Sequence, residues 1–510
     1  MKNILEYLEK TAPRFSDRAA LCDEENGSLS FGEFLSLARA GGSELLRHGL
    51  YHEPVVVFMK KCPRTICAFF SVIYAGCYYI PVDIGMPQQR IQMILEKLRP
   101  RVILYDESSE ALLRELGYEE QMFACGDLFA GSIDDALLAY VRSRALDIDP
   151  IYIVFTSGST GMPKGVTACH RSVIDYAEAL CPVIGADESS VFAMQVPLFV
   201  DACLKELLSV IRCGSEVWLM PQNLFMSPLA ALEYLNRHKV NTLCWVASAL
   251  TMISGFGAFE DVKPACIRTV CFGSEVFPVK QLRLWQEACP GARFINLYGP
   301  TECTGMSFWY EVDHEFDDHE PVPVGHPFDN TDYILLTDND TEAAPGEAGE
   351  ICIRGTCVTL GYYADPERTS ASFTQNPLNK LLPEIIYRTG DLGYVNDRGE
   401  LVFVSRKDNQ IKNMGHRIEL GEIEACADRL DGLESSCCLW DGARHKLILF
   451  YMGSADEKAV RSFMRSELPR HMLPNKILRL DAIPLMANAK IDRIALKKKY
   501  EESLKNGRNP

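Results

Sequence analysis

The chain has 510 residues, a formal net charge of −17 and 47% apolar residues. This length allows two or more domains, and the apolar fraction is typical of a globular protein and excludes a disordered one. The negative charge argues against non-specific binding to nucleic acid or to an anionic membrane. Any site for phosphate groups must therefore be a local positive feature.

The N-terminal segment has acidic residues among its first ten and lacks a long apolar core, so we expect no signal peptide. No apolar run reaches the roughly 18 residues of a membrane span, so we expect no membrane insertion. The 19 cysteines lie in apolar segments and include no C-x-x-C pair. This pattern disfavours a zinc site or a disulfide framework and predicts a cytoplasmic protein with buried thiols.

Strand and helix patterns alternate along the first 300 residues. A capping box at Ser30–Glu33 predicts a helix that reaches Leu46. Alternating elements of this kind imply an α/β fold, with parallel sheets covered by helices on both faces. The other expected elements are strands at Val55–Met59, Tyr78–Asp83, Arg101–Tyr105, Val217–Met220, Val240–Trp245, Ile267–Phe272 and Arg293–Leu297, and helices at Thr65–Ala75, Pro87–Leu98 and from a Ser172 cap to about Leu180.

The pattern changes in the last third of the chain. Short strands separated by acidic and Gly/Pro turns predict a β-rich subdomain at 331–405. A unit of about a hundred residues that mixes strands and helices follows, and a unit of this size could fold alone. We therefore expect an N-terminal core at 1–405, a hinge at 406–409 and a small, mobile α+β domain at 410–510.

The segment Tyr152–Gly165 reads YIVFTSGSTGMPKG. Its apolar start predicts a buried strand, and its glycines, hydroxyls and Lys164 predict a loop whose donors cradle a polyphosphate. One alternative is a flexible Ser/Gly surface loop. Another is a Walker A loop, which fits badly because Pro163 precedes Lys164 and residues 165–167 predict a second strand instead of a helix.

Further motifs follow in a fixed order along almost the whole chain. With them the chain resembles adenylate-forming enzymes, the superfamily that includes stand-alone nonribosomal peptide synthetase adenylation domains, acyl-CoA synthetases and D-alanine–carrier protein ligase. The motifs are Ala75–Gly76 with Ile80–Asp83, Thr156–Gly165, Asn296–Glu302, Gly349–Gly355, Tyr387–Asp391, Arg406–Lys412 with Gly415–Leu420, and Asn488–Arg493.

The resemblance implies ATP and Mg²⁺ as cofactors. Tyr298 then offers a flat face to adenine, Glu302 a hard oxygen to Mg²⁺, and Asp391 acceptors for the ribose hydroxyls. The plainer alternatives are a core tyrosine, a surface glutamate and an Asx-turn aspartate. The residues that the resemblance assigns to ATP are Thr156, Ser157, Gly158, Ser159, Thr160, Gly161, Lys164, Asn296, Tyr298, Gly299, Thr301, Asp391, Arg406 and Lys490, with Thr301, Glu302 and Lys490 as the catalytic set.

Lys490 is the residue that the resemblance places at the adenylation step. Attack of a carboxylate on the α-phosphate gathers negative charge, which a lysine from the small domain can offset. The alternative is a solvated lysine in a surface turn. Asp408 resembles the hinge residue of the family, while Ala489 and Ser405 stand where the family usually has glycine and remove backbone freedom.

In the amino-acid-activating branch an aspartate holds the substrate ammonium, and Asp201 matches it. A carboxylate in an apolar segment needs a cationic partner, and Lys205 is the rival to a substrate ammonium. Bulky Trp245, Phe272 and Leu297 favour a small side chain such as that of alanine, glycine or serine, whereas Lys205 favours an acidic one; a well-packed core is the alternative to a pocket. The residues that the resemblance places around the substrate are Asp201, Ala202, Lys205, Trp245, Val270, Phe272, Leu297, Gly305 and Met306.

The resemblance therefore predicts a ligase that activates an amino acid as aminoacyl-AMP and passes it to the phosphopantetheine thiol of a separate carrier protein. Only about twenty residues follow Lys490, so we expect a stand-alone enzyme. Basic residues near the C-terminus could receive an acidic carrier. The alternatives are an acyl-CoA synthetase-type ligase for a non-amino acid, and a non-catalytic nucleotide-binding or scaffold protein.

Overall fold

The computed structural model describes residues 1–158, 162–318, 320–407, 410–442, 444–484 and 491–505. Ser159, Thr160, Gly161, Asp408, Ala489 and Lys490 lie outside these ranges. The chain divides into two compact units. Unit 1 comprises Met1–Ile84, Leu98–Phe155 and Gly165–Lys407, and unit 2 comprises Gly85–Lys97, Thr156–Lys164 and Asp408–Pro510. The expected hinge at 406–409 stays a prediction.

The first sheet confirms the strands expected around the glycine- and hydroxyl-rich loop. Its paired strands β6, β5, β3, β4 and β7 run parallel, as expected for alternating strands and helices. The loop lies between two strands, β7 and β8, which distinguishes it from a Walker A loop. The order is β6 (Met122–Ala124), β5 (Ile103–Tyr105), β3 (Pro54–Phe58), β4 (Tyr78–Pro81), β7 (Pro150–Thr156) and β8 (Lys164–Cys169).

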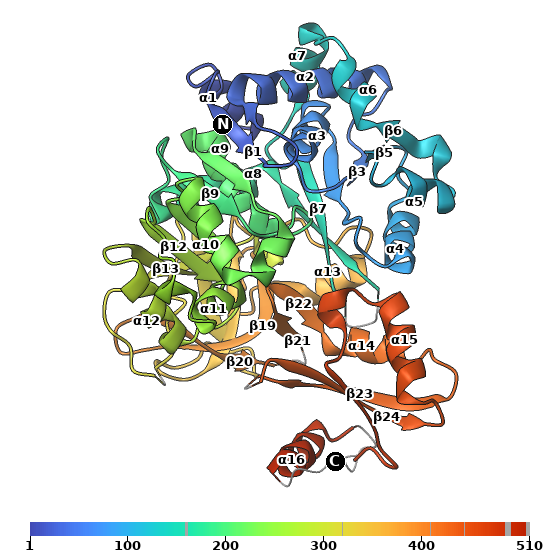
Figure 1. Cartoon of the computed structure of the whole chain (residues 1–510), viewed down its shortest axis with the longest axis vertical. Coiled ribbons are helices and arrows are strands. Elements are labelled where there is room, and N and C mark those ends of the chain that lie inside the picture. Colours follow the sequence, from blue (N-terminus) through green and yellow to red (C-terminus); the bar gives the residue numbers. More distant parts are fainter. Residues whose placement is uncertain (159–161, 319, 408–409, 443, 485–490, 506–510) are drawn as a thin grey trace. The chain divides into compact units, whose positions relative to one another are not determined.

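The second sheet has a parallel centre and antiparallel edges. Its central strands β9, β12 and β13 are labelled in Figure 1. Strands β1, β10, β9, β11, β12 and β13 pair in parallel, whereas β2, β14 and β15 are antiparallel additions. The order is β15 (His326–Pro327), β14 (Phe308–Glu311), β13 (Arg293–Tyr298), β12 (Thr269–Gly273), β11 (Thr242–Val246), β9 (Val191–Met194), β10 (Glu216–Leu219), β1 (Ala19–Cys22) and β2 (Leu29–Ser30).

Most helices of unit 1, though not α5 or α13, bury apolar residues in one large core that includes residues from both sheets. Helix α2 begins with the expected capping box at Ser30 and ends at Arg47. The expected Ser172 cap is wrong: α8 begins two residues earlier, and the Ser172 hydroxyl donates to the Cys169 carbonyl inside the first turn. The α-helices are α1 (Leu5–Thr11), α2 (Phe31–Arg47), α3 (Pro63–Tyr74), α5 (Glu110–Glu115), α6 (Cys125–Ala130), α7 (Asp135–Arg144), α8 (His170–Ile184), α9 (Leu204–Cys213), α10 (Pro228–Arg237), α11 (Ala247–Gly255), α12 (Val279–Ala288) and α13 (Pro366–Ser372).

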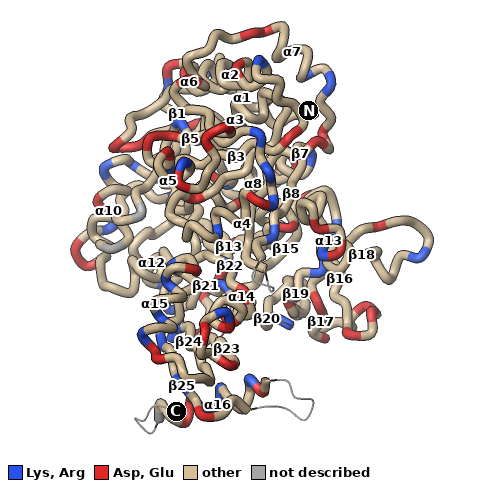
Figure 2. The backbone as a smooth tube through the Cα atoms, turned by 90° about the vertical axis from the view of Figure 1, so that its right-hand side faces the viewer, with Lys and Arg blue, Asp and Glu red and all other residues tan. Residues whose placement is uncertain are grey.

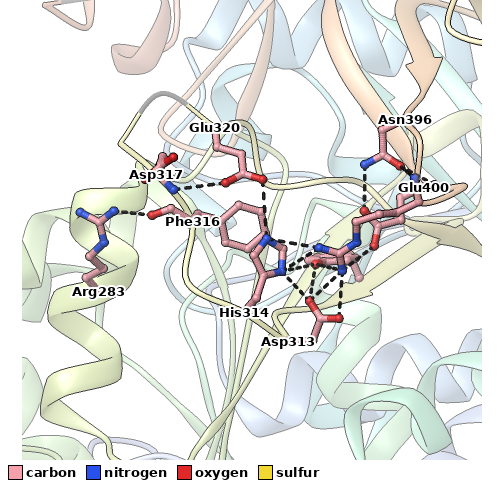
Figure 3. Close-up of polar contacts among 10 residues, drawn as sticks. Arg283, Asp313, His314, Phe316, Asp317, Glu320, Asn396 and Glu400 are labelled. Carbon is pink, nitrogen blue, oxygen red and sulfur yellow. Dashed lines mark hydrogen bonds and ion pairs between the residues drawn. The ribbon is translucent and has the colours of Figure 1, made fainter.

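The expected β-rich subdomain is an antiparallel sheet of five strands. A polar network ties the turn between β19 and β20 to the loop after β14 (Figure 3). Arg398 pairs with Asp313 and with Glu400, in both cases at 3.0 Å, and Asn396 donates to Glu400 at 2.9 Å. The strands are β16 (Thr331–Leu336), β17 (Gly349–Gly355), β18 (Phe373–Gln375), β19 (Ile385–Val395) and β20 (Leu401–Arg406).

Unit 2 has its own hydrophobic core, centred on Ile423, Leu449 and Met464. It contains a hairpin, a three-stranded sheet and helices, as expected for an α+β unit. Among the described residues, no helix combines the length and the apolar composition needed to cross a membrane. The elements are α4 (Gln88–Leu98), β21 (Gln410–Asn413), β22 (His416–Glu419), α14 (Leu420–Ala427), β23 (Leu433–Asp441), β24 (Lys446–Gly453), α15 (Glu457–Glu467), β25 (Lys476–Arg479) and α16 (Arg493–Lys505).

Candidate nucleotide and amino-acid site

Three of the residues assigned to ATP meet in unit 1. Asp391, 4% exposed, accepts a hydrogen bond from the Tyr298 hydroxyl at 2.5 Å and another from Arg406 Nη1 at 2.5 Å. Asp391 and Arg406 are register partners on β19 and β20. The local turn is held by Thr389, whose hydroxyl accepts from the Asp391 N–H at 2.9 Å, so the Asp391 side chain is not needed for an Asx-turn.

Tyr298 is also part of the core, as the plainer interpretation held. Its ring packs edge-on against Phe308, with centroids 5.7 Å apart. Burial and the Asp391 carboxylate raise the pKa of the Tyr298 hydroxyl, which therefore stays a donor at neutral pH. Since a carboxylate has about four lone pairs, Asp391 retains acceptor capacity for hydroxyl groups such as those of a ribose.

Glu302 lies in a short 3-10 turn, Thr301–Cys303, directly after β13. It is fully buried, which excludes a surface glutamate, and its Oε1 accepts from the Tyr362 hydroxyl at 2.7 Å. The approach to this turn depends on Gly299, because a Cβ there would lie 2.4 Å from the Gly305 carbonyl oxygen. Asn296 lies on β13, before this turn, and its Nδ2 donates to the Pro323 carbonyl at 2.8 Å.

The described ends of the glycine- and hydroxyl-rich loop belong to unit 2. The Gly158 N–H donates to Glu422 Oε2 at 3.2 Å, and Glu422 is ion-paired with Arg90. The Ser157 hydroxyl donates to the Arg417 carbonyl at 2.8 Å, while Thr156 Oγ1 is buried with no hydrogen-bond partner in the described ranges. A backbone donor of this loop therefore already binds an anionic oxygen, which is the chemistry that a phosphate group offers.

The residues assigned to the amino-acid pocket gather in unit 1. Trp245 and Phe272 are register partners on β11 and β12, and Leu297 lies on the neighbouring strand β13. These three, together with Val270 and Met306, are buried members of the main core, so they pack as the alternative interpretation expected. Asp201 and Ala202 are half-buried in the turn before α9, and Gly305 has a left-handed φ of 89°.

Lys205 is 3% exposed, and its neighbour along the chain, Glu206, is fully buried. Within the described residues, Tyr152 Oη, Gln195 Oε1 and both carboxylate oxygens of Glu206 have no hydrogen-bond partner. Burial raises the pKa of Glu206 to about 7, against the opposing charges of Lys205 and Lys61. Glu206 was not among the expected site residues, although two adjacent charges in a mostly apolar segment are a signal of a polar interior.

Unit 1 also contains a cavity of about 330 Å³. Its lining comes from the carboxyl ends of strands in both sheets, which is where open α/β sheets bind ligands. Lys61 Nζ donates to the carbonyls of Met194 at 2.7 Å and Met220 at 3.2 Å, and burial lowers its pKa to about 8. The lining residues include Asp23, Lys61, Asp83, Leu198, Phe199 and Met220.

The sequence profile of the AMP-binding enzyme family matches residues 8–363. The chain belongs to this family. It is 31% identical to an L-proline–[L-prolyl-carrier protein] ligase of Streptomyces coelicolor, over 91% of each chain. It is 28% identical to tyrocidine synthase 1 of Brevibacillus parabrevis, and this alignment covers 97% of the present chain but 45% of the relative. The amide bond synthetase McbA of Marinactinospora thermotolerans has a similar fold, with a TM-score of 0.86 at 17% identity over 98% of this chain and 99% of that one.

AMP-binding ligases use ATP with Mg²⁺. The residues present fit both groups: Asp391 and Tyr298 form a polar cluster of the kind that a ribose needs, and Glu302 supplies a buried carboxylate. The described residues hold no group of three His, Cys, Asp or Glu side chains that could bind a metal by themselves. A Mg²⁺ ion held by Glu302 would accordingly need water and ATP phosphate oxygens as its other ligands, as is usual for Mg²⁺ in proteins. There it would supply positive charge to the phosphates.

Proposed function

We propose that this AMP-binding enzyme activates an amino acid as its adenylate and transfers it to the thiol of a separate carrier protein. The observation that carries the proposal is the half-buried Asp201, which lies in the turn Asp201–Cys203 directly before α9. A carboxylate at this position can accept hydrogen bonds from a ligand that carries an ammonium group. The relative from Streptomyces coelicolor, which is named for the same kind of reaction, supports the proposal.

The chemistry divides among the chain's own residues. Asp201 would hold the substrate ammonium and thereby orient its carboxylate, while Tyr298, Asp391 and Arg406 would hold the nucleoside. The donors of residues 156–164 would bind the phosphates. Positive charge from Lys490, which lies outside the described residues, would offset the charge that develops as the substrate carboxylate attacks the α-phosphate and pyrophosphate leaves.

We further propose that the amino acid carries an acidic side chain, with a small one as the second candidate. Lys205 is buried at the first turn of α9, and the pKa of its neighbour Glu206 is about 7. Burial favours the protonated form of Glu206, which weakens Glu206 as a counter-charge for Lys205. An acidic substrate side chain would complete the charge balance, whereas an apolar one would leave the cation without a full counter-charge.

Substrate-dependent exchange of pyrophosphate into ATP tests the proposal. All common L- and D-amino acids are assayed, with the deaminated analogue of each active compound as control. We expect exchange with an amino acid, strongest for an acidic one, and none with its deaminated analogue. Equal activity with the analogue would support an acyl-CoA synthetase-type ligase, and no exchange with any acid would support a non-catalytic protein.

Two substitutions and one control substitution test the residue roles in the same assay. Lys490→Ala should lower exchange by about a thousandfold, the loss typical of one transition-state contact, while ATP binding measured by calorimetry is retained. Lys205→Met should raise KM for an acidic substrate by about tenfold to a hundredfold, and Glu206→Gln, which keeps the lysine, should not. Unchanged exchange by Lys490→Ala would remove that residue from its role.

The second half-reaction requires an acceptor thiol to reach the activated carboxyl group. The cavity lined by Lys61, Phe199 and Met220 is a candidate route for this thiol, because Phe199 is only two residues before Asp201 in the sequence. On unit 2, α15 carries Lys458, Arg461 and Arg465, and Figure 2 shows the basic residues along this helix. These cations would suit an acidic carrier protein. Transfer to a phosphopantetheine-loaded carrier but not to coenzyme A is the expected result.

A further inference from the structure

Two cysteines meet where α8 and α9 come together. Cys181 lies near the end of α8 and is fully buried, while Cys213 is the last residue of α9 and is partly exposed. Their thiols lie close enough for each to shift the pKa of the other. Of the 19 cysteines, all of which are described and reduced, only Cys213 and Cys266 are not buried. Cys213 therefore combines access from solvent with a second thiol in contact.

The surroundings of Cys213 favour its thiolate. Arg212 Nη1 donates to Cys213 Sγ at 3.6 Å, and the same guanidinium is held by Glu178 through Nη2 at 2.8 Å. Glu178 is itself held by the Tyr7 hydroxyl, so the cation is fixed beside the sulfur. The neighbouring Cys181 thiol and then Arg212 lower the pKa of Cys213, whereas the neighbouring Cys213 thiol and burial raise the pKa of Cys181. The outer sulfur is the nucleophile and the inner one remains a thiol.

We propose that Cys213 and Cys181 form an oxidation-sensitive dithiol that hydrogen peroxide converts to a disulfide. The Cys213 thiolate attacks one peroxide oxygen and breaks the O–O bond; with one proton this gives a sulfenic acid and water. The Cys181 sulfur then attacks the Cys213 sulfur, its proton leaves with the hydroxyl group as a second water, and an S–S bond forms. Two electrons pass from the two sulfurs to the peroxide, and a small dithiol reverses the change.

The chain contains two matched pairs in which the same reaction is not expected. Cys244 and Cys271 are register partners on β11 and β12, and Cys303 and Cys357 contact each other under the β-rich subdomain. All four are buried. Contact between two thiols is thus common in this chain, but only at Cys213 does it occur together with exposure and a neighbouring guanidinium. Access and thiolate character together decide where peroxide reacts.

The dithiol is joined to the start of α9. The Ser209 hydroxyl lies 3.9 Å from Cys181 Sγ and donates to the Lys205 carbonyl at 2.8 Å. A disulfide would fasten the C-terminal end of α9 to α8 by a covalent bond. It would therefore restrain the helix whose first turn carries Lys205 and Glu206.

Oxidation of the full-length protein and peptide mapping test this proposal. The protein is treated with hydrogen peroxide, alkylated and analysed by mass spectrometry. We expect a linked peptide pair containing Cys181 and Cys213, about 2 Da lighter than the sum of the reduced peptides and released by dithiothreitol. During peroxide treatment the Cys213 thiol should disappear about tenfold faster than that of Cys266, the other partly exposed cysteine, as judged by the fraction of each that can still be alkylated. The reason is that Cys213 has a neighbouring thiol and a guanidinium that favour its thiolate.

Three variants make the outcome decisive. Cys213→Ser should abolish the linked peptide, and Cys181→Ser should leave Cys213 as a sulfenic acid that dimedone traps. Cys271→Ser, in a buried pair, should form the Cys181–Cys213 disulfide as the parent does. The proposal is overturned if Cys213 reacts no faster than Cys266, or if the first disulfide to form joins other cysteines.

Discussion

At the scale of single residues, close backbone approaches are what constrain the candidate site most. Gly273 ends β12, and an added Cβ would lie 2.1 Å from the Leu297 carbonyl oxygen on β13. Gly299 is similarly close to the Gly305 carbonyl oxygen, at 2.4 Å. These neighbours are backbone atoms of packed strands and turns, so they cannot rotate away as a side chain can. The strand ends that surround the candidate pocket thus depend on glycine.

Gly273→Ala should destabilise the protein by about 1–3 kcal/mol, because the methyl group forces β12 and β13 apart. Gly126→Ala is the control: in α6 no heavy atom lies within 4 Å of the added Cβ, and the substitution should stabilise by about 0.5–1 kcal/mol. Urea unfolding followed by circular dichroism measures both. A Gly273→Ala protein as stable as the parent would show that this contact is not rigid.

At the scale of elements, the termini of helices are set by short-range polar contacts. At the start of α2 the Ser30 hydroxyl accepts from the Glu33 N–H at 3.2 Å, and Glu33 Oε2 accepts from the Ser30 N–H at 2.8 Å. Helix α10 also starts after a serine, Ser227, but that side chain makes no capping hydrogen bond. The same residue type therefore has different energetic weight at the two helices.

Ser30→Ala should lower the free energy of unfolding by about 1 kcal/mol, since the Glu33 N–H in the first turn of α2 loses its acceptor, the Ser30 hydroxyl. Ser227→Ala should change it by less than about 0.5 kcal/mol. Thermal unfolding at several protein concentrations compares the two variants with the parent. Equal losses in both would mean that the capping box contributes nothing beyond an ordinary N-cap serine.

At the scale of the whole molecule, a buried histidine connects the N-terminus to the start of α8. His170 Nδ1 accepts from the Ile4 N–H at 3.3 Å, and burial lowers the pKa of His170 from 6.5 to about 3. The native state thus keeps this imidazole neutral, while the unfolded chain binds a proton below pH 6.5. The contribution of His170 to stability is complete above pH 6.5 and is lost as the pH falls towards 3.

Between pH 6.5 and pH 4 the parent should lose up to about 1.4 kcal/mol per pH unit through this group, in addition to the effects of other groups. His170→Gln should be less stable at pH 7 but should show a shallower loss over the same interval. His326→Gln, at an exposed histidine, should leave the slope unchanged. Denaturant midpoints at half-unit pH steps measure the slopes, and parallel curves for all three proteins would contradict the assignment.

Much of the architecture could be predicted because its signals are local. Val55–Met59 was expected as a strand and is β3 at Pro54–Phe58, and the Ser30 capping box begins α2 as expected. Apolar periodicity and caps report on neighbours within a few residues, so they survive in a linear sequence. The same local logic failed at Ser172, because several residues could start that helix and the structure begins it after Cys169 instead.

The motifs also indicated which residues matter, but not what they touch. Tyr362 donates to Glu302 from 60 positions away, and Glu422 accepts from Gly158 across 264 positions. The burial of Glu206 could not be predicted from its spacing in the sequence. The same is true of the proximity of Cys213 to Cys181. Family, element order and candidate residues followed from patterns along the chain. Partners, burial and pKa shifts were decided by packing, because desolvation and hydrogen bonding depend on neighbours in space.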